Sequence, residues 1–301
     1  MKNKKPSSNI VSLTDRLLNK NSSRNMNGDR NNKPFTRVIA ITSGKGGVGK
    51  TNIVANLGFS LSRLGRKVLI LDADLGLGNL DILLGLAPKY NFSHVITGLK
   101  TIDQIIINGP GDMKILPASS GIQELTNLTR GQKTDFISEL DSYITSIDVV
   151  LIDTAAGIST NVMYFNSIAQ EIMVIVSPEP TAITDAYALM KILSLKYLET
   201  NFNLIVNCVN NKDEAYDVFR QLKLVADKFL NITIEYVGYV LLDKNITRSV
   251  KLQKLVSDIY PDSIGSKCFK YLANKIFNTP PPNIPTGDSS FHIEHFLKHD
   301  Y

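Results

Sequence analysis

The chain has 301 residues, of which 43% are hydrophobic, so it can form one large α/β domain or two small ones, and we expect one domain with tails. Residues 1–37 hold nine Lys and Arg against two Asp, whereas the other 264 residues carry 24 basic and 26 acidic side chains. This slightly acidic body argues against sequence-independent binding to nucleic acid. Cys208 and Cys268 lie far apart and outside metal-ligand spacing, so neither a disulfide nor an iron–sulfur cluster is predicted.

The first 35 residues are rich in Asn, Ser, Lys and Arg, and we predict that they form a disordered basic arm. Within the arm, Ile10, Leu13 and Leu17 follow helical spacing, which fits either a partner-docking peptide or a chance scatter of apolar residues. The basic start is not followed by an uninterrupted apolar run, and the sequence has no apolar run long enough to span a membrane. We therefore expect a cytoplasmic protein.

A glycine-rich loop follows the first predicted strand, 38–42, and precedes the predicted helix 50–64. From Gly44 to Thr51 it reads Gly-Lys-Gly-Gly-Val-Gly-Lys-Thr, which matches the G-x-x-x-x-G-K-[ST] phosphate loop. Backbone N–H groups and the helix N-terminus bind phosphate, Lys50 adds a mobile cation, and Thr51 offers a hydroxyl to Mg²⁺. The predicted nucleotide-binding residues are Gly44, Lys45, Gly46, Gly47, Val48, Gly49, Lys50, Thr51 and Asn52.

Short apolar runs alternate with helical stretches from residue 38 onward. This pattern predicts an α/β fold with a doubly wound, mostly parallel sheet and helices on both faces. The predicted strands are 38–42, 67–72, 113–116, 148–152, 171–177, 203–208 and 235–240. The predicted helices are 50–64, 80–85, 121–128, 133–145, 159–168, 181–200, 213–229, 245–256 and 263–277. Three consecutive prolines after residue 279 predict that the domain spans 36–278 and that 279–301 is a linker with a final amphipathic segment.

Acidic residues at the carboxyl ends of strands are site candidates, because a parallel sheet binds ligands beyond those ends. Asp153 follows four hydrophobic residues, which is the Walker B pattern for a carboxylate that holds Mg²⁺ through its water shell. The N–H of Gly157 is expected to approach a γ-phosphate as part of a switch. Asp72 and Asp74 leave a second strand, and their spacing favours different roles, although one of them can instead cap the helix that begins near Asn79.

A second lysine, Lys45, lies inside the phosphate loop, and Lys-Gly-Gly-Val-Gly-Lys-Thr resembles the deviant loop of the MinD/ParA family of ATPases. The resemblance implies that ATP and ADP bind with Mg²⁺, that ATP drives homodimerisation, and that Lys45 reaches the phosphates of the partner. The alternative for Lys45 is a solvated surface lysine. The catalytic residues implied are Lys45, Lys50 and Asp74, of which Asp74 positions the attacking water. The residues implied for Mg²⁺ are Thr51, Asp72 and Asp153.

Two longer segments, 72–85 and 177–191, resemble the FlhG (FleN, YlxH) branch of this family, whose members regulate flagellar number. The resemblance covers about residues 36–277 and implies slow regulatory ATP hydrolysis and control of flagellar number and placement. The partners implied are the flagellar GTPase FlhF and flagellar basal-body or regulatory proteins. Three alternatives remain: a ParA-type DNA-partitioning ATPase, a MinD-type regulator of the division site, and a scaffold that binds nucleotide without hydrolysis.

The same resemblance assigns adenine contacts to Asn207, whose amide can both donate to and accept from a base, although an Asn at a strand end is also a common turn former. Asp243 is the candidate in a second base-binding segment, 240–243, where the chain lacks a proline that many family members have. In 177–191 we predict that Thr181 caps a helix and that Asp185 lies in its first turn, beside the dimer and partner surface.

The last residues carry an apolar face. Ile293, Phe296, Leu297 and Tyr301 share one side of a helical wheel. The family resemblance implies a C-terminal helix that binds membrane once ATP has dimerised the protein, which would place the ATP form on the inner face of the cell membrane. The alternative is that this segment docks on the body of its own chain.

Overall fold

A computed structural model of the chain describes residues 36–74, 78–117 and 130–280. The arm 1–35, the predicted helix 121–128 and the apolar face of the last residues lie outside the described residues.

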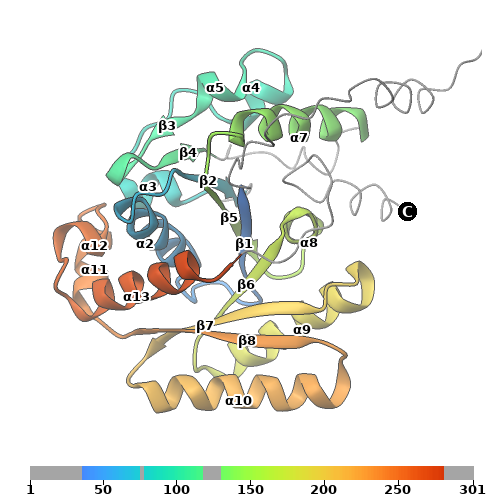
Figure 1. Ribbon diagram of the computed structural model, residues 1–301, viewed down its shortest axis with the longest axis vertical. Helices are drawn as coiled ribbons and strands as arrows, with labels where there is room; N and C mark the ends of the chain where they lie inside the picture. The colour runs from blue at the N-terminus through green and yellow to red at the C-terminus, as the bar shows by residue number, and fades with distance from the viewer. Residues whose placement is uncertain (1–35, 75–77, 118–129, 281–301) are drawn as a thin grey trace, which may run out of the picture. The chain divides into compact units, whose positions relative to one another are not determined.

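In the described ranges, eight strands form one sheet in the order β3-β4-β2-β5-β1-β6-β7-β8 (Figure 1). The strands are β1 (Arg37–Ser43), β2 (Val68–Ala73), β3 (Ile107–Asn108), β4 (Lys114–Leu116), β5 (Val149–Ala156), β6 (Glu171–Val176), β7 (Asn201–Val209) and β8 (Thr233–Leu241). Every neighbouring pair is parallel except β3 with β4. The predicted doubly wound α/β fold is therefore confirmed, whereas the short antiparallel strand β3 was not predicted.

Helices of very different lengths connect the strands. They are α2 (Lys50–Arg63), α3 (Leu80–Leu84), α4 (Phe92–Ile96), α5 (Ile102–Ile105), the 3₁₀ turn η1 (Pro110–Asp112), α7 (Arg130–Ile144), α8 (Thr160–Ile168), α9 (Pro180–Tyr197), α10 (Lys212–Phe229), α11 (Lys244–Lys251), α12 (Val256–Ile259) and α13 (Ile264–Asn278). Within these ranges no helix combines the length and the apolar character that crossing a membrane requires.

The predicted helix 245–256 is wrong as a single element, because the chain turns between α11 and α12. Gln253 adopts a left-handed conformation with φ 54°, which ends helical geometry. The turn brings Leu255 and Val256 into the core, where they are 1% and 0% exposed. In a straight helix Val256 would share a face with Ser249, but Leu255 would lie about 120° away around the axis, so the turn is what lets both residues face the core.

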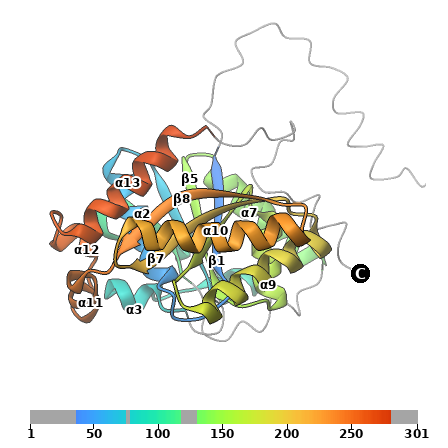
Figure 2. The same cartoon turned by 90° about the horizontal axis from the view of Figure 1, so that it is seen from below.

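Two apolar layers enclose the sheet. In the central strand β1, Ile39 and Ile41 pack with residues of α2 and α13, whereas Val38 and Ala40 point to the other face and pack with α7 and α8. Figure 1 shows α2 beside α13 on one side of the sheet, and Figure 2 shows α10 lying along β7 and β8. Because the long strands are parallel, their carboxyl ends meet at one edge, and the segments that follow them surround a common space.

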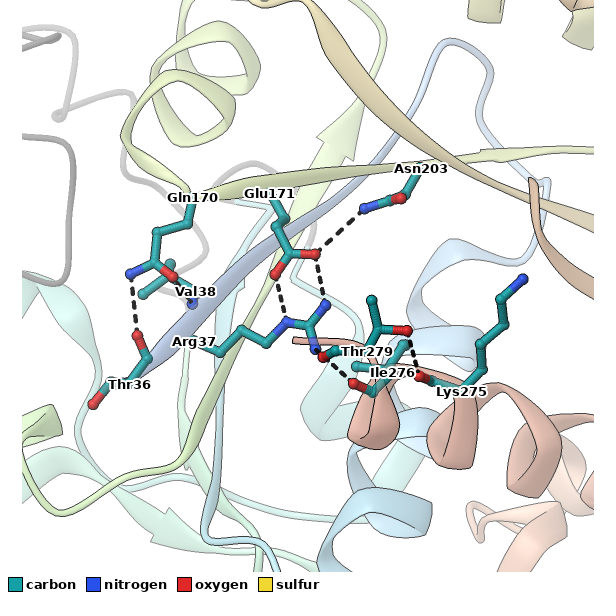
Figure 3. A network of polar contacts seen from close by, with 9 residues as sticks. All are labelled: Thr36, Arg37, Val38, Gln170, Glu171, Asn203, Lys275, Ile276 and Thr279. Carbon is teal, nitrogen blue, oxygen red and sulfur yellow. Dashed lines mark hydrogen bonds and ion pairs between the residues drawn. The ribbon is translucent and has the colours of Figure 1, made fainter. Parts of the chain in front are cut away.

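At the opposite edge, Arg37 fastens the start of β1 to two other elements (Figure 3). Its guanidinium forms a bidentate ion pair with Glu171 at the start of β6, with 2.7 Å between Nη2 and Oε2. Nη1 also donates to the carbonyls of Ile276 and Thr279 at the end of α13, with 3.0 Å to Thr279. The Arg37 and Glu171 side chains are only 11% and 8% exposed, so this ion pair is largely shielded from water.

Candidate nucleotide-binding site

A pocket of about 630 Å³ opens at the carboxyl edge of the sheet. The residues predicted from sequence that line it are Lys45, Gly46, Gly47, Val48, Gly49, Lys50, Thr51, Asn52, Asp74, Asn207 and Asp243. Gly44, Asp72 and Asp153 do not line it. The structure thus brings the predicted phosphate loop, one of the predicted acids and both predicted base contacts to one cavity.

Two glycines of the phosphate loop are in places that no other residue could occupy without rearrangement. Gly49 has φ 84°, and a Cβ atom there would lie 2.5 Å from Nδ2 of Asn207. A Cβ atom on Gly44 would lie 2.1 Å from the carbonyl oxygen of Asp185 in α9. The loop is therefore packed directly against the end of β7 and against the backbone of α9.

Asn207 supports the phosphate loop. Its Nδ2 donates to the carbonyl of Val48 at 2.7 Å, and the residue is 7% exposed. A buried amide of this kind fixes the loop and satisfies a carbonyl that would otherwise lack a partner. The adenine contact expected of Asn207 stays a prediction, because one of its amide donors already serves the loop.

Lys50 and Asp153 form a buried ion pair, with 2.9 Å between Nζ and Oδ1 and side chains only 7% and 1% exposed. Burial raises the pKa of Asp153, although Lys50 and a hydrogen bond from the Thr51 side chain oppose the rise. The helix that starts at Lys50 thus begins against the carboxyl end of β5.

Asp72 lies next to Asp153 across the β2–β5 ladder and is 3% exposed. Its carboxylate accepts the N–H of Asp74 at 3.2 Å and that of Leu80, so Asp72 caps the start of α3 as one alternative proposed. Burial, and secondly the charge of Asp153, raise the pKa of Asp72 to about 8. Asp72 and Asp153 are thus two adjacent buried carboxyl groups, of which Asp153 is paired with Lys50.

The oxygen atoms gathered here fit a divalent cation. Thr51, Asp72 and Asp153 offer a hydroxyl and two carboxylates, which are the oxygen ligands that Mg²⁺ prefers. In the part of the chain that the structure describes, no group of three or more His, Cys, Asp and Glu side chains could hold a metal by itself. Such a sparse donor set suits Mg²⁺, which usually keeps several waters and binds partly through the phosphates of a nucleotide.

Lys45 is bound by side chains of its own chain. Its ammonium contacts the carboxylate of Glu179 and lies 2.8 Å from the hydroxyl of Thr181, at the junction of β6 and α9. The prediction that Thr181 caps the helix is wrong, because α9 begins at Pro180 and Glu179 occupies the N-cap position. Asp185 consequently lies beyond the first turn of α9.

The segment 154–157 at the end of β5, which we expect to act as a switch, is hydrogen-bonded to the neighbouring strand β1. Gly157 has φ 92°, and its N–H donates to the carbonyl of Ser43 at 2.9 Å. Thr154 donates through its hydroxyl to the carbonyl of Ile41 at 3.2 Å. An approach of the Gly157 N–H to a γ-phosphate, as expected from sequence, therefore requires the bond to Ser43 to break.

One part of the pocket lining is mostly apolar and, apart from the segment 240–243, was not predicted. It comes from α3, α11 and α13 and from the ends of β7 and β8. The lining residues there are Ile82, Leu83, Cys208, Leu241, Leu242, Ile246, Thr247, Val250, Gln253 and Phe269. In α11 the spacing of Ile246, Thr247 and Val250 signals one helix face, but the same spacing is typical of any helix packed on a core.

Asp243 stands at this apolar end, but its carboxylate is turned to protein donors. It accepts the N–H of Asn245 at 2.8 Å and the N–H of Gly265 at 2.9 Å. Partial burial by itself would raise the pKa of Asp243, yet these hydrogen bonds outweigh it and lower the pKa. The predicted base contact through this carboxylate remains a prediction.

Comparison with known proteins gives consistent matches. A family model described as an AAA domain matches residues 36–206, more than half of the chain. The antiactivator FleN of Pseudomonas aeruginosa is 41% identical over 263 residues, which cover 87% of this chain and 94% of that protein. The flagellum site-determining protein YlxH of Helicobacter pylori is 32% identical over 266 residues, which cover 88% of this chain and 89% of that protein.

Among solved structures, the septum site-determining protein MinD of Pyrococcus horikoshii, complexed with Mg-ADP, superposes with a TM-score of 0.66 at 25% identity. The match covers 81% of this chain and 96% of that chain. The MinC:MinD cell division protein complex of Aquifex aeolicus also contains a similar chain, with a TM-score of 0.66, 25% identity and coverage of 84% and 100%.

Proposed function

Because the chain belongs to the MinD/ParA family of ATPases and is similar over most of its length to FleN and YlxH, we propose that it is a slow regulatory ATPase that controls flagellar number and placement. The observation that carries the proposal is the pocket. Residues 45–51 of the phosphate loop line it, and Lys50 of this loop forms a buried ion pair with Asp153, the ladder neighbour of Asp72. We propose a cycle between an ADP-bound monomer and an ATP-bound homodimer.

In the proposed chemistry, the loop amides and Lys50 bind the β- and γ-phosphates. The residues that would hold Mg²⁺ are Thr51, Asp72 and Asp153. When bound, Mg²⁺ supplies positive charge that offsets the charge developing on the transferred phosphoryl group. Lys50 would exchange its present partner, Asp153, for phosphate oxygens, and the adjacent carboxylates would then be free to serve the cation.

Asp74 is proposed to position the attacking water. It is half-buried at the mouth of the pocket, directly after the buried strand that carries Asp72. A carboxylate there can accept a hydrogen bond from water and orient it for in-line attack on the γ-phosphate. Lys45 would leave Glu179 and stabilise the phosphates of the partner in the dimer, so each active site would be complete only when two copies meet.

In this scheme ATP hydrolysis limits the lifetime of the dimer, because it returns the dimer to monomers. The ATP dimer would contact the membrane surface through the C-terminal segment from the cytoplasmic side, and would contact flagellar proteins, including the GTPase FlhF. The printed names of FleN and YlxH, an antiactivator and a flagellum site-determining protein, support an output of this kind. Binding to nucleic acid is not expected, because the body outside residues 1–37 has two more acidic than basic side chains.

The decisive experiment is light scattering after size exclusion, with ADP and with ATP, on an Asp74→Ala background that slows hydrolysis. The same samples are then mixed with liposomes of anionic lipid and, separately, with duplex DNA. We expect a dimer only with ATP, loss of that dimer in Lys45→Ala, and flotation of the dimer with liposomes. A protein that stays monomeric with ATP would contradict the proposed cycle, and uptake of DNA without liposome binding would favour a partitioning ATPase.

A further inference from the structure

One carboxylate, that of Asp243, joins the first turns of two helices. Oδ1 accepts the backbone N–H of Asn245 in α11, and Oδ2 accepts the backbone N–H of Gly265 in α13. The side chains of Ser263 and Asn245 also hydrogen-bond to it. Both helix N-termini direct their partial positive charge at this one group, which stabilises its ionised form.

The two helices have different places in the pocket. α11 supplies Ile246, Thr247 and Val250 to the apolar part of the pocket wall. α13 supplies Phe269 and packs along α2, the helix that begins with Lys50 of the phosphate loop (Figure 1). Asp243 therefore ties α11 to α13, which packs on the helix that carries Lys50 of the loop.

The starts of α11 and α13 are closely packed around Asp243. A Cβ atom on Gly265 would lie 2.9 Å from Cδ1 of Ile246 and 3.2 Å from Oδ2 of Asp243. Beyond the other end of α11, the side chain of Gln253 donates to the carbonyl of Ile82 in α3 at 2.9 Å. α11 is thus tied to its neighbours at the start, through Asp243, and just after its end, through Gln253.

We propose that Asp243 is a positioning residue for nucleotide binding: it holds α11 against α13, and so sets the fit of the base and ribose in the pocket without touching them. This inference rests on the proposed function, since it takes the pocket to be the ATP site. The phosphate loop is held by other contacts, such as those of Asn207 and Asp185. Binding of the phosphates should therefore not depend on Asp243.

The test compares two ligands in the presence of Mg²⁺: ATP and inorganic tripolyphosphate. The ratio of their dissociation constants isolates the contribution of adenosine. In Asp243→Ala we expect ATP to lose about tenfold in affinity, while the affinity for tripolyphosphate changes by less than about twofold. Asp243→Asn can still cap α11 but places an amide donor near the N–H of Gly265, so we expect an intermediate loss.

Ser263→Ala acts on the same contact from outside the pocket, because Ser263 hydrogen-bonds to Asp243 but does not line the cavity. We expect a smaller loss in the same direction. If Asp243→Ala fails to fold, Asp243→Asn and Ser263→Ala carry the comparison. Hydrogen exchange should show faster exchange of the amides of residues 244–251 in each variant that lowers the affinity for ATP relative to the affinity for tripolyphosphate.

Asn211→Ala is the matched control. Asn211 caps α10 by accepting the N–H of Glu214 at 2.9 Å, and it does not line the pocket. Loss of this cap lowers stability by a similar mechanism. The ratio of ATP to tripolyphosphate affinity should be unchanged in this variant, which separates positioning of the wall from general destabilisation.

Several results would overturn the inference. If Asp243→Ala and Asp243→Asn keep the wild-type ratio, Asp243 does not shape the base end, while tight ATP binding by the unmutated chain would still support the proposed function. If Asp243→Asn alters the preference for ATP over GTP and Ser263→Ala leaves the ratio unchanged, Asp243 contacts the base directly. If the unmutated chain binds neither ligand, the proposed function fails together with the inference.

Discussion

The ammonium of Lys45 lies against the carboxylate of Glu179 in the same chain, on the side of the phosphate loop that faces α9. In the proposed dimer this ammonium serves the phosphates of the other copy, so it must first leave Glu179. The ion pair therefore competes with dimerisation. Its side chains are 35% and 63% exposed, and exposed ion pairs contribute about 0–1 kcal/mol, so the competition is weak enough for ATP to overcome.

Replacing Glu179 with Gln should tighten the ATP dimer by up to about thirtyfold, because each of the two copies loses a competing ion pair worth about 0–1 kcal/mol while the size of the side chain is kept. The measurement is the dimer dissociation constant from analytical ultracentrifugation with ATP on the Asp74→Ala background. Asp227→Asn is a matched control, since it breaks the exposed Lys223–Asp227 pair of α10. An unchanged constant in Glu179→Gln would show that the pair does not restrain Lys45.

Removing Lys50 leaves the buried carboxylate of Asp153 without its cation. Lys50→Met should lower the free energy of unfolding by about 3–5 kcal/mol at pH 8, as the loss of one partner of a buried ion pair does. The loss should be smaller at pH 5, where Asp153, whose pKa burial already raises, can take up a proton. Urea denaturation at the two pH values measures the difference.

The double variant Lys50→Met, Asp153→Asn separates stability from activity. It removes both buried charges, so we expect it to recover most of the stability lost in Lys50→Met. ATP hydrolysis, followed by phosphate release, should remain absent in both variants because phosphate and Mg²⁺ ligands are missing. If the double variant still hydrolyses ATP, then neither Lys50 nor Asp153 has the role proposed for it in the site.

The raised pKa of Asp72 predicts how stability depends on pH. The folded protein keeps a proton on Asp72 up to about pH 8, whereas the unfolded chain releases it near the ordinary pKa of 3.8. The stabilising effect of that proton is complete below the lower value and is lost as pH rises toward the higher one. The slope from this single group is at most about 1.4 kcal/mol per pH unit.

Thermal unfolding of the metal-free, nucleotide-free protein between pH 5 and pH 8.5 tests this dependence. Asp72→Asn should flatten the profile and raise the melting temperature at pH 8, because the buried negative charge is gone. Glu199, whose pKa burial raises to about 7, contributes in the same direction, so Glu199→Gln should remove a further part of the slope. Equal slopes in Asp72→Asn and in the unmutated protein would contradict the prediction.

Asn207 should affect every ligand that uses the phosphate loop. Asn207→Ala removes the hydrogen bond to the carbonyl of Val48, and we expect both ATP and tripolyphosphate to bind about tenfold more weakly. This outcome differs from that expected for Asp243. The control is Asn203→Ala at the other end of β7, where the amide donates to Glu171 at 3.4 Å. Loss of ATP affinity alone would instead assign Asn207 to the base.

Local patterns explain why the fold and the phosphate end of the site could be predicted. Each buried strand is a short apolar run, and the loop is one contiguous motif between a strand and a helix. Asp153 likewise follows its own strand directly. The contact of Gly44 with Asp185, and that of Lys45 with Glu179, join segments far apart in sequence. A single sequence gives no sign of such pairs.

Short elements were missed for a different reason. The helices α4 and α5 have five and four residues, too few to show a helical period. Only the capping box of Thr101 and Gln104 gave a local signal for α5. Asp243 lines the pocket, but its bond to Gly265, 22 residues further along, depends on how α13 returns to the sheet, which the sequence does not indicate.

Arg37 at the start of the first strand donates to the carbonyls of Ile276 and Thr279 at the end of the last helix. The two ends of the domain, near residues 36 and 280, therefore lie close together at the edge away from the nucleotide pocket. A short linker from residue 280 to residue 36 would therefore join the two ends of the domain without crossing the pocket. New termini could be opened at the exposed turn around Gly98, between α4 and α5, with the order of strands in the sheet preserved. Circular permutation would then give a nucleotide-binding domain with both ends free to carry reporters at an exposed turn.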